Sequence, residues 1–145
     1  MTGPDRPAAS DSPGSPGASG PAVLDASAVL AWLRAEPGAD VVESYLEAAV
    51  ISAVNLSEIY QKLAQRGVDA DRTLRQLRTL GIGIEPVTAA DAVTAAALWP
   101  VTRAAGLSLG DRCCLALATR LDGPAITADT AWTQLEVGVT VVPIR

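Results

Sequence analysis

The stretch "AVLDASAVLAWL", which spans Ala22–Leu33, is apolar except for Asp25 and Ser27. Its first residues form the short apolar run of a buried strand, and the residues after Asp25 follow the spacing of a helix. Asp25 therefore lies at a junction between a strand and a helix. The simplest interpretation is that Asp25 is an N-cap, because an aspartate oxygen readily accepts a free backbone N–H of the first helical turn.

Short apolar runs continue to alternate with longer helical patterns up to the C-terminus. Further strands are predicted at 50–54, 83–87, 124–127 and 139–144. Helices are predicted at 27–34, 40–48, 55–66, 70–80, 89–105 with a kink at Trp99–Pro100, and 108–121, with a short helical turn near Trp132. The expected fold class is α/β, an α/β/α sandwich with a central, mostly parallel sheet of about five short strands.

Residues 1–22 differ in composition from the rest of the chain. They are mostly Pro, Gly, Ser and Ala, hold half of the ten prolines, and show no apolar period. Such a segment buries too little surface to offset the entropy lost on ordering, so we predict a disordered tail at 1–22 and one domain at 23–145. An alternative is that natural translation starts nearer Val23.

Nothing in the sequence indicates export or a membrane. No apolar h-region precedes a cleavage site, and no apolar run reaches the length of a membrane span. Cys113 and Cys114 are adjacent in an apolar helical pattern, where neighbouring side chains do not face each other, so a structural disulfide is not expected. Reduced core cysteines fit a cytoplasmic protein.

The sequence contains no histidine. This excludes Ser-His-Asp and Cys-His catalysis and most catalytic zinc sites. Hydrolytic chemistry would therefore depend on carboxylates, on metals, or on both. The formal net charge of −5 argues against a nucleic-acid partner, unless several of the acids bind divalent cations.

Four carboxylates have positions that suit a common site. Asp25 and Asp129 follow predicted strands, and the carboxyl ends of parallel strands border the functional crevice of such sheets. Glu58 lies on the helix after the second strand, and Asp111 lies in the first turn of the most apolar helix. Each also has a purely structural explanation. Asp111 would favour a helix dipole and Asp129 would cap a turn, whereas Glu58 would pair with a lysine one turn further on.

Four carboxylates at one edge of a sheet would repel one another, and some of their pKa values would rise. A hard divalent cation such as Mg²⁺ or Mn²⁺ removes this repulsion and still leaves positions for water and phosphate oxygens. Such a site suits phosphodiester hydrolysis, because the metal lowers the pKa of water and stabilises charge on the phosphate without a histidine.

Four segments carry a resemblance to a known family: "VLDASAVLAWL", "AVNLSEIYQKL", "LSLGDRCCLALA" and "AITADTAW". Their order and separation over 23–145 resemble the PIN-domain ribonucleases, most closely the VapC-type toxins of bacterial type II toxin–antitoxin pairs. The resemblance implies a PIN-like fold, Mg²⁺- or Mn²⁺-dependent endoribonuclease activity, and inhibition by a cognate antitoxin. These toxins usually begin almost at the first strand, and the segment 1–22 departs from that pattern.

The same resemblance assigns roles to individual residues. Four carboxylates are expected to be catalytic and to bind the metal, the first two as the principal ligands: Asp25, Asp111, Glu58 and Asp129. Ser27 matches a small hydroxyl position of the first motif and has a supporting role. Asn55 lies one helical turn before Glu58 and is expected to line the pocket.

Six basic residues are candidates for contacts with RNA phosphates or with an acidic antitoxin segment: Lys62, Arg66, Arg72, Arg75, Arg78 and Arg112. An ordinary solvated helix face explains most of them equally well. An antitoxin's C-terminal segment is expected in a groove formed by the helices over 55–80, with a basic side chain near the pocket. The expected assembly is a homodimer or a toxin–antitoxin hetero-oligomer, with no membrane partner.

Other protein classes fit the sequence less well. A phosphoacceptor receiver domain would need an acidic pair after the first strand and a lysine after the last, but "LDASA" has one acid and Lys62 is the only lysine. A phosphatase of the haloacid-dehalogenase type would need D-x-D, and Ser27 occupies the third position. The remaining alternative is a catalytically inactive α/β binding module, which would not need all four acids.

Overall fold

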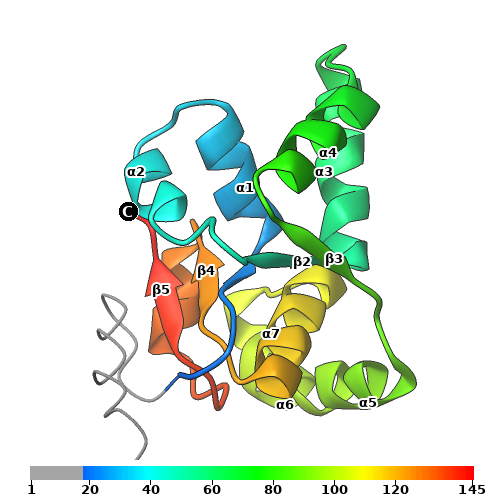
Figure 1. Cartoon of the computed structure of the whole chain (residues 1–145). Coiled ribbons are helices and arrows are strands. Elements are labelled where there is room, and N and C mark those ends of the chain that lie inside the picture. The colour runs from blue at the N-terminus through cyan, green and yellow to red at the C-terminus, as the bar shows by residue number, and fades with distance from the viewer. Residues whose placement is uncertain (1–17) are drawn as a thin grey trace, which may run out of the picture.

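A five-stranded sheet forms the centre of the computed structural model, which describes residues 18–145. The strands are β1 Val23–Leu24, β2 Val50–Ser52, β3 Gly83–Glu85, β4 Ala125–Thr127 and β5 Val141–Pro143. Every neighbouring pair is parallel, and the order is β3-β2-β1-β4-β5 (Figure 1). The sheet confirms the predicted α/β class.

The helices of the described residues lie close to their predicted positions. They are α1 Ala26–Leu33, α2 Ala39–Glu43, α3 Ala53–Gln65, α4 Ala70–Thr79, α5 Ala89–Ala97, α6 Trp99–Thr102 and α7 Leu109–Leu121, with the 3₁₀ helices η1 Arg103–Ala105 and η2 Thr130–Gln134. The helix predicted over 89–105 is interrupted near Pro100, whose missing N–H favours a helix start. The helix predicted over 40–48 ends at Glu43, because the chain turns through Ala48 (φ 59°) to enter β2.

The two faces of the sheet face separate apolar cores, because successive strand residues point to opposite sides. Toward α1–α4, the strands contribute Leu24, Ile51 and Ile126. Toward α7, they contribute Val23, Val50 and Ala125. Figure 1 shows α1–α4 on one side of the sheet and α5–α7 on the other. The predicted sandwich is therefore present, with the sheet buried on both faces.

The folded chain begins slightly before the predicted boundary at Val23. Ser19 Oγ donates a hydrogen bond to Asp122 Oδ2 (2.9 Å), and the Gly20 N–H donates to the Asp122 carbonyl (2.7 Å). A Cβ on Gly20 would overlap the Leu121 carbonyl, so only glycine fits at this position. The predicted tail at 1–22 thus overlaps the domain by a few residues, and its remaining part, 1–17, lies outside the described residues.

The strand order reverses between β1 and β4, which are hydrogen-bonded neighbours with connections that lead in opposite directions. In open α/β sheets, a crevice forms at such a reversal, outside the carboxyl ends of the strands. Asp25 follows β1 directly, and Asp129 follows β4 by two residues. Among residues 18–145, no helix has the length and apolar character needed to cross a bilayer.

Candidate functional site

A pocket of about 180 Å³ lies at this carboxyl edge, and three of the predicted acids line it. Asp25 comes from the end of β1, Glu58 from α3, and Asp111 from the first turn of α7. The other lining residues are Ala26, Ser27, Leu30 and Lys62. The structure therefore brings together side chains that are up to 86 positions apart in the sequence, from Asp25 to Asp111.

Asp25 is 4% exposed and occupies the N-cap position of α1, but its side chain makes no capping hydrogen bond. Instead, Oδ2 accepts one hydrogen bond from Ser27 Oγ (2.6 Å) and another from Thr127 Oγ1 (3.2 Å). The interpretation of Asp25 as a helix cap is therefore wrong for the side chain. Two hydroxyl groups hold this carboxylate in place.

Burial raises the pKa of the Asp25 carboxyl to about 6, from an ordinary value of 3.8. The hydrogen bond from Ser27 opposes this rise, whereas the nearby charges of Asp111 and Glu58 add to it. No ion pair within residues 18–145 joins Glu58 to Lys62, so the simple structural explanation of Glu58 is not observed. The pocket thus concentrates negative charge that has no paired cation.

Thr127 is a site residue that the sequence analysis missed. It is fully buried at the end of β4, and its hydroxyl also accepts a hydrogen bond from the Asp129 N–H (3.0 Å). Ser27 Oγ similarly accepts one from the Ala128 N–H (3.0 Å). The turn after β4 is therefore connected to Asp25 through two hydroxyls. The sequence feature that could have indicated Thr127 is a hydroxyl residue at the end of a predicted strand, two positions before an aspartate.

Asp111 combines a structural role with its place in the pocket. Its Oδ2 accepts a hydrogen bond from the Ser108 N–H (2.8 Å), and its own N–H donates to Ser108 Oγ (3.1 Å), which is a capping box. Burial raises the pKa of the Asp111 carboxyl, the two Ser108 hydrogen bonds oppose this, and the charge of Asp129 raises it again. The helix-end explanation of Asp111 therefore holds alongside its position among the acids.

Asn55 is fully buried beneath the pocket and contacts Glu58. Asn55 Nδ2 donates to Glu58 Oε1 (2.8 Å) and to the Gly110 carbonyl (3.2 Å). Asn55 thus lies behind the Glu58 carboxylate and does not line the pocket itself.

Asp129 stands apart from the other three acids. It is exposed, does not line the pocket, and caps η2 by accepting a hydrogen bond from the Ala131 N–H (3.0 Å). Its influence on the pKa of Asp111 nevertheless places it near that carboxylate. Trp132, in the turn after Asp129, is fully buried in the core under α7, whereas Trp99 is 49% exposed.

The predicted basic residues occupy several different places. Lys62 lines the acidic pocket. Arg66, Arg72 and Arg75 line two other pockets along α1, α3 and α4. Arg112 points away from the acids, because its Nη1 donates to the Ala95 carbonyl (2.7 Å) on α5. Arg78, on α4, is exposed and lines none of these pockets.

The donor set suits a hard divalent cation, because the side-chain donors at the pocket are carboxylate and hydroxyl oxygens beside one lysine. Within residues 18–145, no three Asp, Glu or Cys side chains are grouped closely enough to hold one ion between them. Mg²⁺ binds through one or two carboxylates and keeps several waters, so it does not require a closed protein cage.

Comparisons with known proteins agree with this fold. The PIN domain family model matches residues 22–137. A toxin–antitoxin complex from Klebsiella pneumoniae superposes with a TM-score of 0.70 at 20% identity, covering 86% of this chain and 98% of that chain. FitAcB from Neisseria gonorrhoeae gives a TM-score of 0.65 at 21% identity, covering 85% and 97%.

A third solved structure, VapBC2 from Rickettsia felis bound to a DNA fragment from its promoter, gives a TM-score of 0.61 at 12% identity. That match covers 84% of this chain and 97% of the other. No curated protein matches the sequence. At these identities, the three structures establish a shared fold.

Proposed function

The chain belongs to the PIN-domain family, and on that premise we propose that it is a metal-dependent endoribonuclease that acts as the toxin of a toxin–antitoxin pair. The observation that carries the proposal is the pocket in which Asp25, Glu58 and Asp111 meet, with no ion pair to any of the three among residues 18–145. A structural ion-pair network would place a basic partner against these carboxylates. A binding site for a divalent cation leaves them unpaired.

In this proposal, Asp25 and Asp111 hold Mg²⁺ or Mn²⁺, and Glu58 and Asp129 complete the acidic site. The bound ion would lower the pKa of a water molecule and neutralise charge on the scissile phosphate. No hydrogen bond from the described residues reaches Oδ1 of Asp25, so that oxygen is available to a ligand, while Ser27 and Thr127 orient the carboxylate through Oδ2. Lys62 lies where it can attract an RNA phosphate.

The direct test is cleavage of single-stranded RNA by protein freed of metal with a chelator. We expect no cleavage until Mg²⁺ or Mn²⁺ is added, and little cleavage by D25N or D111N at any ion concentration. Cleavage by the chelated protein, or equal cleavage by D25N and wild type, would contradict the proposal. RNA binding without cleavage in every condition would instead favour the inactive binding module.

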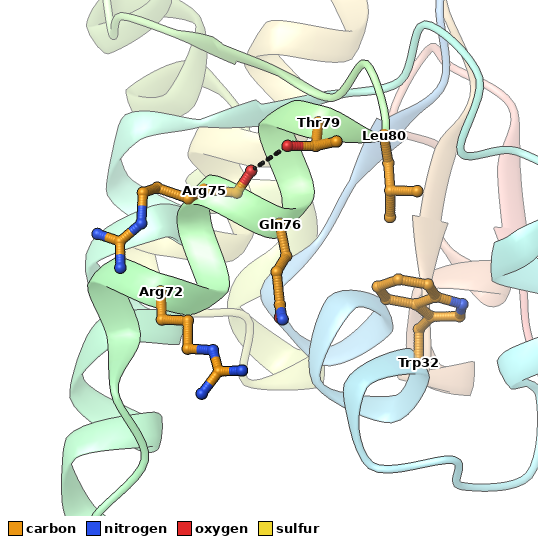
Figure 2. Close-up of a pocket in the computed structure, with 6 residues that line it drawn as sticks. All are labelled: Trp32, Arg72, Arg75, Gln76, Thr79 and Leu80. Atoms are coloured by element: carbon orange, nitrogen blue, oxygen red, sulfur yellow. Dashed lines mark hydrogen bonds between the residues drawn. The ribbon is translucent and has the colours of Figure 1, made fainter.

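For the antitoxin, we propose a docking groove along α1 and α4, and two features of the groove support it. A pocket of about 480 Å³ lies between Trp32 near the end of α1 and the residues of α4, which continue to Leu80 (Figure 2). A second pocket, of about 290 Å³, shares Gln76 and extends the groove toward Arg66. Its surface combines apolar side chains with arginines, so we assign it to an amphipathic segment with acidic residues.

The structure changes the expected composition of this groove. Ile59 and Leu77, on α3 and α4, are buried in the core and line neither pocket, whereas Leu63 lies at the floor of the second pocket. The exposed apolar surface comes instead from Leu80, which is 47% exposed, and from Trp32 on α1. The proposed groove therefore includes α1 as well as the helices over 55–80.

The docking proposal is tested by co-expression with the product of the adjacent upstream reading frame, followed by hydrogen exchange on the complex. We expect protection at α4, at the end of α1 and at the acidic pocket. R75E should weaken the complex, and E47K, on the surface of a different pocket, should not. Protection confined to α5–α7 would contradict this placement.

A further inference from the structure

One buried amide joins two elements of the acidic pocket. Asn55 and Glu58 are one turn apart on α3, and Gly110 lies in the first turn of α7. Asn55 Nδ2 donates to Glu58 Oε1 (2.8 Å) and to the Gly110 carbonyl (3.2 Å). The Glu58 carboxylate is therefore connected to α7, although 52 positions separate it from Gly110.

The orientation of the Asn55 amide is determined by its two neighbours, because a carboxylate and a carbonyl both accept hydrogen bonds. The NH₂ group must face both of them, and Oδ1 is left buried without a hydrogen-bond partner among the described residues. A buried acceptor with no partner lowers stability, so such a group in a native structure calls for an explanation. Holding Glu58 is an explanation that these contacts provide.

Gly110 is the second unusual feature at this point. A Cβ there would overlap Glu58 Oε1 and lie 2.9 Å from Glu58 Cδ. Glycine is unfavourable inside a helix, and the regular backbone of α7 does not require it at this position. The close approach of the Glu58 carboxylate accounts for this glycine.

We propose that Asn55 and Gly110 are positioning residues that hold the Glu58 carboxylate against the first turn of α7, facing Asp25 and Asp111. We name this pair the Glu58 clamp. It maintains the third carboxylate beside two others that repel it, so the pocket is preformed before an ion arrives. The proposal rests on the proposed metal-dependent function, but the clamp itself is a set of contacts within the chain.

Asn55 is the only asparagine in the sequence, so a protein labelled with ¹⁵N-asparagine shows one side-chain amide. In the ion-free protein, we expect the Asn55 NH₂ protons to exchange with solvent at least tenfold more slowly than those of a free asparagine. G110A displaces the Glu58 carboxylate and E58A removes it, and each should increase the exchange rate severalfold. Unchanged exchange in both variants would overturn the clamp.

Binding of Mn²⁺ provides the second measurement. G110A should weaken Mn²⁺ binding at least fivefold while the melting temperature of the ion-free protein stays equal or rises, because alanine is the better helix former. In an E58A background, G110A should change the Mn²⁺ affinity less than twofold, since the clamp acts only through Glu58. Equal losses in the two backgrounds would overturn the proposal.

T102V is the matched control. Thr102 is fully buried, and its hydroxyl donates to the Leu98 carbonyl (2.8 Å) away from the pocket. This variant should lower the melting temperature and leave Asn55 exchange and Mn²⁺ affinity unchanged. A wild-type protein that fails to cleave RNA with Mn²⁺ would contradict the proposed function, whereas the Asn55 exchange measurement judges the clamp independently.

Discussion

Two aspartates in this protein are almost equally buried and have opposite surroundings. Asp25 is 4% exposed and Asp91 is 3% exposed. Asp91, on α5, accepts hydrogen bonds from Arg120 Nε at Oδ1 (3.0 Å) and Oδ2 (3.2 Å), and from the Thr88 N–H (3.1 Å). Asp25 receives two hydroxyl hydrogen bonds and faces two other carboxylates. The two carboxylates are about equally buried, but only the charge of Asp91 is compensated by a basic side chain.

The pKa values of the two carboxyls record this difference. Burial alone would raise the pKa of Asp91, but the Arg120 hydrogen bond and the Thr88 N–H together lower it below the ordinary value. Burial and the acidic neighbours together raise the pKa of Asp25 to about 6, against the opposing hydrogen bonds from Ser27 and Thr127. The charge of Asp91 therefore stabilises the fold, whereas the charge of Asp25 opposes folding. The comparison separates a structural carboxylate from a candidate ligand.

The largest expected effect is that of D25N on RNA cleavage. Loss of a metal ligand should lower the cleavage rate at least about 100-fold, because the ion contributes several kcal/mol to transition-state stabilisation. The ion-free protein should be as stable as wild type or more stable, by up to about 3 kcal/mol, since a buried uncompensated charge is removed. Urea unfolding and RNA cleavage measure the two effects. A D25N protein that is strongly destabilised would place Asp25 in the same structural class as Asp91.

D91N should give the reverse result. Removing a buried charge that is paired with Arg120 should lower the free energy of unfolding by about 1.5–3 kcal/mol, the range for hydrogen bonds to charged groups. Arg120 is 31% exposed, which favours the lower part of that range. RNA cleavage at a temperature where the variant is folded should stay within twofold of wild type. Loss of cleavage by fully folded D91N would remove the contrast between the two residues.

Mn²⁺ should raise the melting temperature of D91N but not that of D25N. An ion that binds only the folded state at 100 times its dissociation constant stabilises it by about 2.7 kcal/mol, a rise of several degrees in the melting temperature. We expect this rise in wild type and D91N and its absence in D25N. The measurement is thermal unfolding of chelator-treated protein against Mn²⁺ concentration. A curve that does not respond up to tens of millimolar Mn²⁺ would contradict the metal site.

The smallest expected effect is a loss of folding stability at low pH. Because the folded-state pKa of Asp91 is lowered, its ionised carboxylate stabilises the fold fully at any pH above the ordinary carboxyl pKa. This stabilisation is lost as the pH falls through the ordinary value toward the lowered one. The loss should be smaller than that caused by D91N, and D91N should flatten the pH dependence of unfolding below about pH 4. Urea midpoints of wild type and D91N at pH 7 and pH 3 measure it. Parallel losses in the two proteins would assign the acid sensitivity to other groups.

Local patterns in the sequence predicted most of the fold. The apolar runs at β2 and β4 mark strands, and the alternation with helices predicts the parallel sheet. The position of Asp25 after a strand and of Asp111 at a helix start also follows from these patterns. Boundaries differ where a turn decides them, as at Ala48 and near Pro100. Whether the four acids bind metal and act in catalysis stays a prediction.

The sequence by itself determined the order of the elements and the placement of acids at their ends, because hydrophobic period, capping residues and turn residues are properties of neighbours along the chain. Only the tertiary structure decided which of these acids share a pocket and what holds each in place. Ser27 meets Thr127 across 100 positions, and Asn55 reaches Gly110 across 55. A local pattern cannot contain such contacts, because they form only when the sheet aligns β1 with β4 and packs α3 against α7.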